Sequence, residues 1–413
     1  MNLLLAVTGS ISAYKTLDIT REWVKAGHSV KVVLTAGALQ FVVPQVFKYL
    51  GASEVFLPLD DFKYPKEEQD PGSVLHIELG KWADKLILAP LSANSLSRIV
   101  SGQAGDLLNS VFLAFDPGKP VLAFPAMNTK MLDHPFVERN LELLDELPNV
   151  FVHPSSSGEL ACGDIGAGKL PTVDTILTAT EAVSLKTIDK QAGLKKHILI
   201  STGATVSPLD PVRYLTNASS GITGYHLAIE SLKRGHKVTV VAGKFATAKL
   251  ELLTHLPHFQ LLRVTTATEM ASVLDKYFSY ADSYISAAAI SDIEFEFNQS
   301  KLKKDGLKGA LPTKPGFDIL ANLLAKKTHQ KIVGFAAETE LTSEVLLEKF
   351  NRKPVDLLVG TKVNNGLGRE NKKVEGFSNL NADYGLMQAK GQIAYKSLSK
   401  SGLAKEILER ITL

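Results

Sequence analysis

The chain has 413 residues, of which 45% are hydrophobic and 22% charged, and its formal net charge is +3. This length predicts two or three domains of about 150 residues each, with the composition of a globular protein. The balanced charge argues against a protein that binds nucleic acid along its whole length, although local basic patches stay possible. The single cysteine excludes an intramolecular disulfide.

Residues 3–7 form the first apolar run, which is shorter than the roughly 7 residues that a signal sequence needs. No stretch reaches the roughly 18 apolar residues of a membrane-spanning helix. We therefore expect a cytoplasmic protein that binds neither membranes nor nucleic acids.

Strand and helix patterns alternate along the first half of the chain. Residues 3–7 predict a buried strand, and residues 12–26 predict a helix that Gly27 would end. Further strands are expected at residues 30–34, 85–88, 121–124 and 150–153. Such alternation is typical of a parallel sheet with helices on both faces.

The same pattern starts again near residue 196, with a strand at 197–201, a helix at 224–233 and a strand at 237–241. The segment from Lys25 (KAGHSVKVV) matches the segment from Lys233 (KRGHKVTVV), so both halves use the same helix end, turn and strand. We predict an α/β protein of two doubly wound, Rossmann-like, three-layer domains with mostly parallel sheets. Their expected bounds are 1–185 and 196–413, joined by a linker at 186–195.

Two polar loops follow strands in the first half, where open α/β sheets bind their ligands. Residues 8–13 (TGSISA) open a helix, and residues 90–95 (PLSANS) follow a second strand. Free N–H groups at a helix start favour a phosphate, although Ser10 or Ser12 could equally serve only as a helix cap. Two such loops on one sheet indicate a phosphate site more strongly than one.

Three further residues of the first half are candidates for chemistry. His76 is a lone histidine in an apolar context and, taken alone, is more often structural. Asn128 directly follows a strand, where it could instead make a local turn. Cys162 lies in a glycine-rich segment, although a buried, inert thiol is the simpler interpretation. A nearby match to the phosphate-loop pattern at residues 163–170 is rejected, because Leu170 replaces the Mg²⁺-binding hydroxyl.

Together, HIELGKWAD, PLSANSLSRI, PAMN and ACGDIGAG resemble flavoprotein decarboxylases that act on C-terminal or amide-linked cysteine, over roughly residues 1–180. The resemblance implies bound FMN and the substrate 4′-phosphopantothenoylcysteine. It assigns His76 as base, Asn128 to the substrate carboxylate with Met131 nearby, and Cys162 as a late proton donor. The FMN-binding residues that it implies are Gly9, Ser10, Ile11, Thr35, Ser92, Ala93, Asn94 and Ser95.

Polar groups also follow the strands of the second half. Arg213 and Asn217 precede a Ser-Ser-Gly that opens a helix, which suits a phosphorylated acid, although an arginine paired inside a surface loop is common. Asp292 follows a strand, and Lys301 lies in a lysine run of the kind that is more often a solvated face. Lys349 and Lys353 are four residues apart and are expected to share a helix face.

DPVRYLTN with SSG, AAAISD, KLKK and GFAAET resemble phosphopantothenate–cysteine ligase, over about residues 196–400. Their position behind a decarboxylase domain resembles the bacterial bifunctional enzyme that makes 4′-phosphopantetheine for coenzyme A. The resemblance implies 4′-phosphopantothenate, cysteine and CTP as substrates, with Mg²⁺ carried by the nucleotide and no protein metal site. It assigns Arg213 to the acid substrate, and Asn217 and Lys301 to catalysis. The nucleotide-binding residues that it implies are Ser286, Ala287, Ala288, Asp292, Lys301, Gly316, Phe317, Asp318, Ile319, Phe335, Lys349 and Lys353.

The ligase half departs from its family at several positions. Ile222 stands where a lysine is usual after Ser-Ser-Gly, Ser207 where a glutamate is usual, and Thr361 where an asparagine is usual. A decarboxylase with a weakened ligase domain therefore stays open. A non-catalytic flavin-binding regulatory subunit is disfavoured because His76 and Cys162 are present and the acidic tail of such proteins is absent. Relatives form trimers through the flavin domain and dimers through the ligase domain, so a homo-oligomer, and specifically a dodecamer, is expected.

Overall fold

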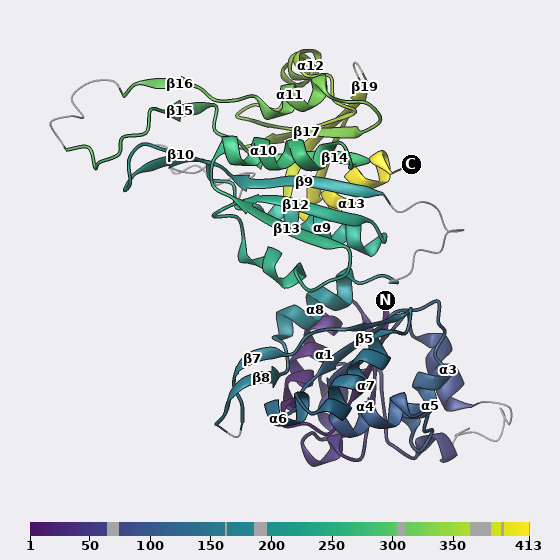
Figure 1. Cartoon of the computed structure of the whole chain (residues 1–413). Helices are drawn as coiled ribbons and strands as arrows, with labels where there is room; N and C mark the ends of the chain where they lie inside the picture. Colours follow the sequence, from purple (N-terminus) through teal and green to yellow (C-terminus); the bar gives the residue numbers. More distant parts are fainter. Residues whose placement is uncertain are drawn as a thin grey trace. The chain divides into compact units, whose positions relative to one another are not determined.

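The computed structural model describes residues 1–63, 74–161, 163–185, 196–303, 311–363, 381–389 and 392–412. The chain divides into two compact units, shown in Figure 1. The first comprises Met1–Ala192 with His255–Pro257, and the second comprises Gly193–Thr254 with His258–Leu413. Within the described ranges, no helix has both the length and the apolar character that a membrane crossing requires.

A six-stranded sheet in the order β3-β2-β1-β4-β5-β6 forms the centre of the first unit, and all its strand pairs are parallel. These strands are β1 (Asn2–Val7), β2 (Ser29–Leu34), β3 (Glu54–Phe56), β4 (Lys85–Leu91), β5 (Val121–Pro125) and β6 (Val150–Val152). The chain leaves β1 in opposite directions toward β2 and β4, which opens a crevice at the carboxyl ends of these strands. The predicted doubly wound fold is confirmed here.

Helices on both faces of this sheet complete the first unit. They are α1 (Lys15–Lys25), α2 (Pro44–Tyr49), α3 (Leu75–Trp82), α4 (Ala93–Val100), α5 (Leu107–Leu113), α6 (Thr129–Leu132), α7 (Pro135–Asp145) and α8 (Val173–Ala182), with short 3-10 turns at Ile11–Tyr14, Ala38–Gln40 and Asp60–Lys63. An antiparallel hairpin of β7 (Ser156–Glu159) and β8 (Ile165–Lys169) follows β6. The hairpin occupies the segment that nearly matches a phosphate loop, which agrees with rejecting that pattern.

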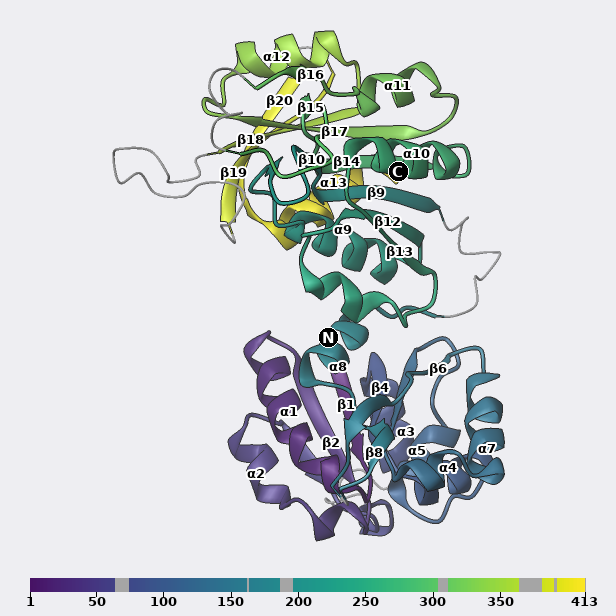
Figure 2. The ribbon, with the colours of Figure 1, turned by 60° about the vertical axis from the view of Figure 1, so that its left-hand side comes forward.

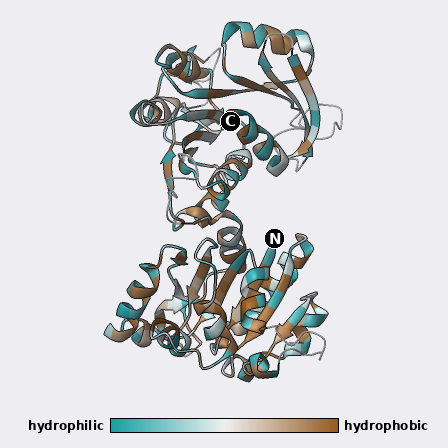
Figure 3. Cartoon of the chain, turned by 90° about the vertical axis from the view of Figure 1, so that its right-hand side faces the viewer, coloured by the Kyte–Doolittle hydropathy of each residue, from teal (hydrophilic) through white to brown (hydrophobic). Residues whose placement is uncertain are grey.

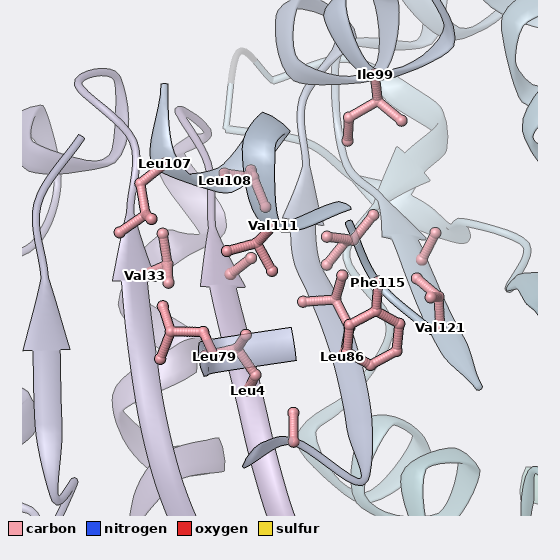
Figure 4. Packing of buried hydrophobic residues seen from close by; sticks show 14 of the residues in the cluster. Leu4, Val33, Leu79, Leu86, Ile99, Leu107, Leu108, Val111, Phe115 and Val121 are labelled. Carbon is pink, nitrogen blue, oxygen red and sulfur yellow. The ribbon is translucent and has the colours of Figure 1, made fainter. Parts of the chain in front are cut away.

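The core of the first unit lies between its sheet and the helices α3 and α5. Leu79 from α3 and Val111 from α5 pack over Leu4 and Leu86 of the central strands, with Phe115 beside them (Figure 4). All five side chains are nearly or fully buried. Figure 3 shows the same pattern in the hydropathy of the strands, which carry most of the hydrophobic colour.

Two lysines of the first unit cap helices at their carboxyl ends. The Lys85 ammonium, at the start of β4, donates to the carbonyl oxygens of Thr180 and Val183 at the end of α8, both at 2.6 Å. Lys119 donates to the carbonyl of Ala83 at the end of α3, at 2.7 Å. Cations are favoured at this end of a helix, where carbonyls lack helical partners. Lys85 therefore ties the last helix of the unit to the central part of the sheet.

The second unit contains an eight-stranded sheet in the order β13-β12-β9-β14-β17-β18-β19-β20. Its strands are β9 (His197–Ala204), β12 (Lys237–Gly243), β13 (Phe259–Val264), β14 (Ser283–Ala289), β17 (Lys331–Glu338), β18 (Leu357–Lys362), β19 (Asn381–Ala389) and β20 (Gln392–Ser399). The first six are parallel and repeat the strand order of the first unit, whereas β19 and β20 add an antiparallel edge. The prediction of a second, mostly parallel doubly wound sheet is confirmed.

The helices of the second unit are α9 (Ile222–Lys233), α10 (Ala267–Phe278), α11 (Ile319–Ala325), α12 (Ser343–Arg352) and α13 (Lys400–Ile411), with a 3-10 turn at Ala248–Leu253. Two small ribbons complete it: β10 (Val206–Pro208) with β11 (Tyr214–Thr216), and β15 (Ile293–Phe295) with β16 (Thr313–Pro315). Figure 2 shows α9 and α13 near each other, and the two helices are in contact.

The predicted turn at a helix end is present in both units. A separate prediction, that Lys349 and Lys353 share a helix face, is wrong. Gly27 and Gly235 both have positive φ, +82° and +75°, immediately after α1 and α9. In contrast, Lys349 and Lys353 do not share a helix face, because α12 ends at Arg352 and Lys353 is extended, with φ −134° and ψ 91°. The cause is Pro354, since a residue before proline is driven out of the helical region.

Candidate functional site

The two polar loops of the first unit are joined by a buried threonine. The Thr8 hydroxyl donates to the carbonyl of Pro90 at 2.7 Å and accepts from the N–H of Ser92 at 2.8 Å. Thr8 follows β1, and Ser92 follows β4. The hydroxyl therefore holds side by side the two loops that leave the sheet at its crevice.

A third loop, after β2, comes equally close to the first. A Cβ on Gly9 would lie 3.0 Å from the Cα of Gly37, so only glycine lets these two backbones approach as they do. Thr35 continues this loop, and its hydroxyl accepts from the N–H of Ala38 at 3.3 Å. Loops from three adjacent strands thus meet at the carboxyl edge of the sheet.

These loops surround a cavity of about 850 Å³. Ten residues that the sequence singled out lie in its wall. They are Gly9, Ser10, Ile11, Thr35, Ser92, Ala93, Asn94, Ser95, Asn128 and Met131. The volume is within the range of about 300–1,000 Å³ that is usual for small-molecule sites.

The cavity has an apolar part and a hydroxyl-rich part. Ile11 and Met131 are 57% and 48% exposed although they are large hydrophobic residues, and both face the cavity. The hydroxyl of Ser10 lies 3.0 Å from that of Ser12 and makes no capping bond to the helix, so capping does not account for it. Ser92, in contrast, does cap α4 by accepting from the N–H of Ser95.

The lining residues that the sequence analysis missed include three cations, Lys15, Arg98 and Lys169, and two acids, Asp106 and Glu159. Burial, and then repulsion from Lys169, lowers the pKa of Lys15 below its ordinary value. Arg98 lies 3.9 Å from Asp106, so Lys15 and Lys169 are the cations of this wall that favour an anionic ligand. Lys15 could have been found from the sequence, since it opens the helix that follows the first polar loop.

Asn128 combines a turn role with a place in the cavity wall. Its side-chain oxygen accepts from the N–H of Lys130 at 2.9 Å, which is the local bond that a turn residue makes. Its amide nitrogen donates to Asp164 in the β7–β8 hairpin at 3.3 Å. Cys162 lies outside the described residues, and its neighbours Leu160 and Ala161 line the cavity.

His76 lies in the first turn of α3 and not in the wall of this cavity. Its Nδ1 is 2.7 Å from a carboxylate oxygen of Asp61, whose other oxygen accepts from the His76 backbone N–H at 3.2 Å. This pairing fixes the ring and leaves Nε2 as the nitrogen that Asp61 does not engage. A carboxylate–imidazole pair of this kind can act as a general base. The sequence analysis missed Asp61 because 15 residues separate it from His76.

In the second unit, Arg213 stabilises the loop between β10 and β11 through its hydrogen bonds. Its Nε donates to Asp210 at 3.0 Å, and its Nη2 donates to the carbonyl of Leu302 at 2.8 Å. Asp210, only 3% exposed, also accepts from the N–H groups of Val212 and Arg213, both at 2.8 Å. The Arg213 guanidinium, together with these N–H donors, holds the pKa of Asp210 well below its usual range. This geometry matches the alternative of an arginine paired inside a loop.

Two other candidates of the second unit, Asn217 and Asp292, lie near the end of β14. The Asn217 amide donates to the carbonyl of Ala289 at 3.2 Å. Asp292 is exposed and accepts, through its backbone carbonyl, from the N–H of Gly316 at 2.9 Å. Lys301 is also exposed and lies next to Leu302, the partner of Arg213.

Three of the implied nucleotide-binding residues line a small pocket of about 110 Å³: Ala287, Ala288 and Phe335. Residues 219–223 at the start of α9 form another side of it. Ser286, although buried in β14, is not part of its lining. Gly316, Phe317 and Asp318 instead line a separate, more open hollow, and Ile319 is buried behind it.

The two lysines near α12 are held by carboxylates. The Lys349 ammonium is 2.8 Å from Glu338 at the end of β17, and that of Lys353 is 2.6 Å from Asp318 at the start of α11. Within the described part of the chain, no three His, Cys, Asp or Glu side chains come together as metal ligands would.

Comparison with known proteins matches each unit to a protein family. Residues 1–184 match the family described as Flavoprotein, and residues 194–413 match the DNA/pantothenate metabolism flavoprotein C-terminal domain. The chain is therefore a two-part α/β flavoprotein of pantothenate metabolism.

Its relatives define the family more narrowly. The coenzyme A biosynthesis bifunctional protein CoaBC of Bacillus subtilis is 36% identical, over 89% of this chain and 87% of that protein. That of Haemophilus influenzae is 33% identical, over 99% of this chain and 97% of that protein. A crystal structure of the C-terminal domain of a CoaBC protein is 26% identical, with a TM-score of 0.42, and covers 53% of this chain and 95% of that domain. The chain belongs to the family of coenzyme A biosynthesis bifunctional proteins, which confirms the resemblance read from its motifs.

Proposed function

We propose that this chain makes 4′-phosphopantetheine in two steps. The second unit joins cysteine to 4′-phosphopantothenate at the expense of CTP, and the first unit, carrying FMN, decarboxylates the product. Membership of the bifunctional family supports the pairing of these activities. The observation that carries the decarboxylase is the 850 Å³ cavity, because it gathers every implied flavin contact at one sheet edge.

The lining of that cavity fits FMN. The flavin ring is flat and largely apolar, which suits the exposed Ile11 and Met131. The phosphate is anionic, which suits the serine hydroxyls and the cation of Lys15. Bound FMN would supply the two-electron oxidation of the cysteine thiol and the later return of these electrons.

The protein groups would handle protons and charge around that chemistry. His76, held by Asp61 through Nδ1, presents Nε2 as the base for the thiol proton. Asn128 binds the substrate carboxylate beside Met131, which requires its amide to leave Asp164. Cys162 delivers a proton to the product after CO₂ has left, as the resemblance implies.

A second copy of the chain would complete this site. His76 is not in the cavity wall of its own chain, although the proposed chemistry needs a base there. Large apolar side chains are exposed next to its partner Asp61, with Phe62 78% and Leu59 57% exposed. Covering these side chains by association would remove apolar surface from water. We therefore propose a trimer of first units, and dimers of second units, as in the dodecamer expected from the sequence.

The ligase proposal assigns roles to residues near the end of β14 and α12. The acid substrate binds by Asn217 and Arg213, which requires the Arg213 guanidinium to share or leave its bonds to Asp210 and Leu302. The substrate carboxylate then attacks the α-phosphate of CTP, and the cysteine amine displaces the nucleotide. Lys301, Lys349 and Lys353 bind phosphates, together with Mg²⁺ carried by CTP. The two lysines near α12 must exchange their carboxylate partners for phosphate to do so.

Product mass analysis tests both steps at once. The purified protein is incubated with 4′-phosphopantothenate, cysteine, Mg²⁺ and CTP, and in parallel with ATP. We expect 4′-phosphopantetheine with CTP only. If nothing forms but added 4′-phosphopantothenoylcysteine still loses CO₂, the ligase part of the proposal is wrong. If no substrate loses CO₂, the decarboxylase part is wrong.

A further inference from the structure

The wall of the large cavity in the first unit contains a cation that the implied flavin contacts do not use. Lys169 ends β8, lines the cavity and is exposed. No carboxylate of the residues that the structure describes forms an ion pair with its ammonium group. The implied flavin contacts come instead from the loops after β1, β2 and β4. Lys169 is therefore left for another ligand of this cavity.

Backbone contacts hold the end of β8, the second strand of the hairpin in Figure 1, against residues 127–129. The carbonyl of Gly168 accepts from the N–H of Met127 at 3.0 Å, and the carbonyl of Ala167 accepts from the Thr129 hydroxyl at 2.6 Å. A Cβ on Gly168 would lie 2.1 Å from the carbonyl oxygen of Met127, so this close approach needs glycine. The strand that carries the cation is thus anchored beside the asparagine proposed for the substrate carboxylate.

Lys169 has a neighbour of like charge in the same wall, Lys15 at the start of α1. The Lys15 ammonium donates to the carbonyl of Leu170, the residue after Lys169, at 3.4 Å. Burial, and then repulsion from Lys169, lowers the pKa of Lys15 below its ordinary value. Two cations in one wall repel each other, and anionic groups placed beside them would offset that repulsion.

The two ligands proposed for this cavity carry several anionic groups, namely the phosphate of FMN and both the carboxylate and the phosphate of 4′-phosphopantothenoylcysteine. Lys15 follows Ile11, an implied flavin contact, by four residues on one helical segment, and both line the cavity. Lys15 therefore belongs with FMN. The hairpin supplies none of the implied flavin contacts, so Lys169 belongs with the substrate.

The chemistry of decarboxylation favours the phosphate of the substrate over its carboxylate as the partner of Lys169. The carboxylate loses its charge as CO₂ leaves, so a cation beside it would stabilise the substrate more than the transition state and slow the reaction. The phosphate keeps its charge throughout, and binding energy from this remote group can orient the reacting end. A lysine ammonium binds such a phosphate as a point charge.

We infer that Lys169 binds the 4′-phosphate of the decarboxylase substrate, and that it thereby selects the phosphorylated substrate over pantothenoylcysteine. The inference deepens the proposed decarboxylase activity and rests on it. It requires the chain to discriminate between two substrates that differ only in this phosphate.

The test measures decarboxylation of 4′-phosphopantothenoylcysteine and of pantothenoylcysteine by the full chain. We expect Lys169→Met to raise the KM for the phosphorylated substrate by about tenfold or more, as for the loss of a charge-assisted hydrogen bond. The kcat, and the KM for pantothenoylcysteine, should stay unchanged. Lys169→Arg should retain the preference, because it keeps the charge. Lys48→Met is the control for loss of one charge, since Lys48 is exposed on α2 and does not line the cavity.

A second pair of measurements does not depend on turnover. Calorimetric titration with 4′-phosphopantetheine and with pantetheine should show the same selective loss in Lys169→Met. Bound flavin, measured by its visible absorption after dialysis, should stay at the level of the unaltered chain. Loss of flavin from Lys169→Met would assign the lysine to the phosphate of FMN and overturn the inference.

Other results would contradict the inference in distinguishable ways. An equal loss with both substrates in Lys169→Met would assign the lysine to the carboxylate, which both substrates carry, or to the fold. If the unaltered chain used both substrates with equal KM, it would not recognise the phosphate, and the inference would be wrong although the decarboxylase stands. Failure of the unaltered chain to decarboxylate either substrate would overturn the decarboxylase itself and this inference with it.

Discussion

The two units share a strand order but differ in what lies at its carboxyl edge. In the first unit, three loops meet around an open cavity of about 850 Å³, lined by exposed apolar side chains. In the second, the corresponding edge has a pocket of about 110 Å³, and the candidate cations nearby are paired with carboxylates. The open cavity at the first edge suits a permanently bound ligand. The paired lysines at the second edge suit ligands that bind and dissociate in each turnover.

This difference has an energetic meaning. A tightly held cofactor needs a preformed site, because ordering loops around it would weaken its binding. A charged substrate can instead displace the carboxylates that pair with Lys349 and Lys353, so these partly buried cations keep a partner between turnovers. The same scaffold thus supports both uses through its loops and not through its sheet.

The largest expected effect concerns His76, the proposed base of the first unit. The change His76→Asn should lower the rate of decarboxylation by about 10²–10⁴, the usual contribution of a general base, and leave ligation intact. Asp61→Asn should cause a smaller loss, since Asp61 only orients the ring. The measurement is CO₂ release from supplied 4′-phosphopantothenoylcysteine. Equal losses of both activities in His76→Asn would mean that the change disrupts folding.

The next largest effect tests whether Lys349 in the second unit exchanges its carboxylate partner, Glu338, for a phosphate group of CTP. Lys349→Met should raise the KM for CTP by about tenfold, because a charge-assisted contact to phosphate is lost. Stability should change by less than about 1 kcal/mol, since the Lys349 side chain is 36% exposed and solvent screens its pair with Glu338. Lys396→Met is the control, as it removes another paired lysine of the second unit with similar exposure, the partner of Glu406. A similar rise in KM in the control would argue for a general effect of charge.

An effect of similar size tests how far the cavity of the first unit is preformed. Gly9→Ala places a Cβ against the backbone of Gly37 and should weaken flavin binding about tenfold, as overpacking costs about 1–3 kcal/mol. Gly105→Ala is the matched control, since a Cβ there meets nothing within 4 Å. Bound flavin is measured by its visible absorption after dialysis. Full retention of flavin in Gly9→Ala would show that the two loops can separate without loss.

The smallest effect is confined to acid and to the second unit. The folded pKa of Asp210 is depressed, so its contribution to stability is present above the unfolded value of about 4 and is lost as pH falls below it. Asp210→Asn should remove this part of the acid sensitivity. Hydrogen exchange of the β10–β11 amides measures it. Tryptophan fluorescence serves as the control, because both tryptophans, Trp23 and Trp82, lie in the first unit. A variant as sensitive to acid as the unaltered chain would contradict the linkage.

The sheets and the first site could be predicted from the sequence because they depend on local order. Apolar runs alternate with helical patterns, and the loops after parallel strands must meet at one edge. The pairing of His76 with Asp61, and of Arg213 with Leu302, could not be predicted, since the contacts join residues far apart in the chain. Lys353 could have been placed correctly, had the effect of Pro354 been weighed against the helical spacing.

The cap that Lys85 provides for α8 has a consequence for synthesis on the ribosome. Lys85 is nearly buried at the start of a central strand, and two of its acceptors, the carbonyls of Thr180 and Val183, are among the last residues of the first unit. A nascent chain that has emerged only as far as β6 lacks both of these carbonyl acceptors for the ammonium, which opposes closure of the sheet around it. The first unit therefore reaches its native state only after residue 183 has left the exit tunnel, late in its own translation.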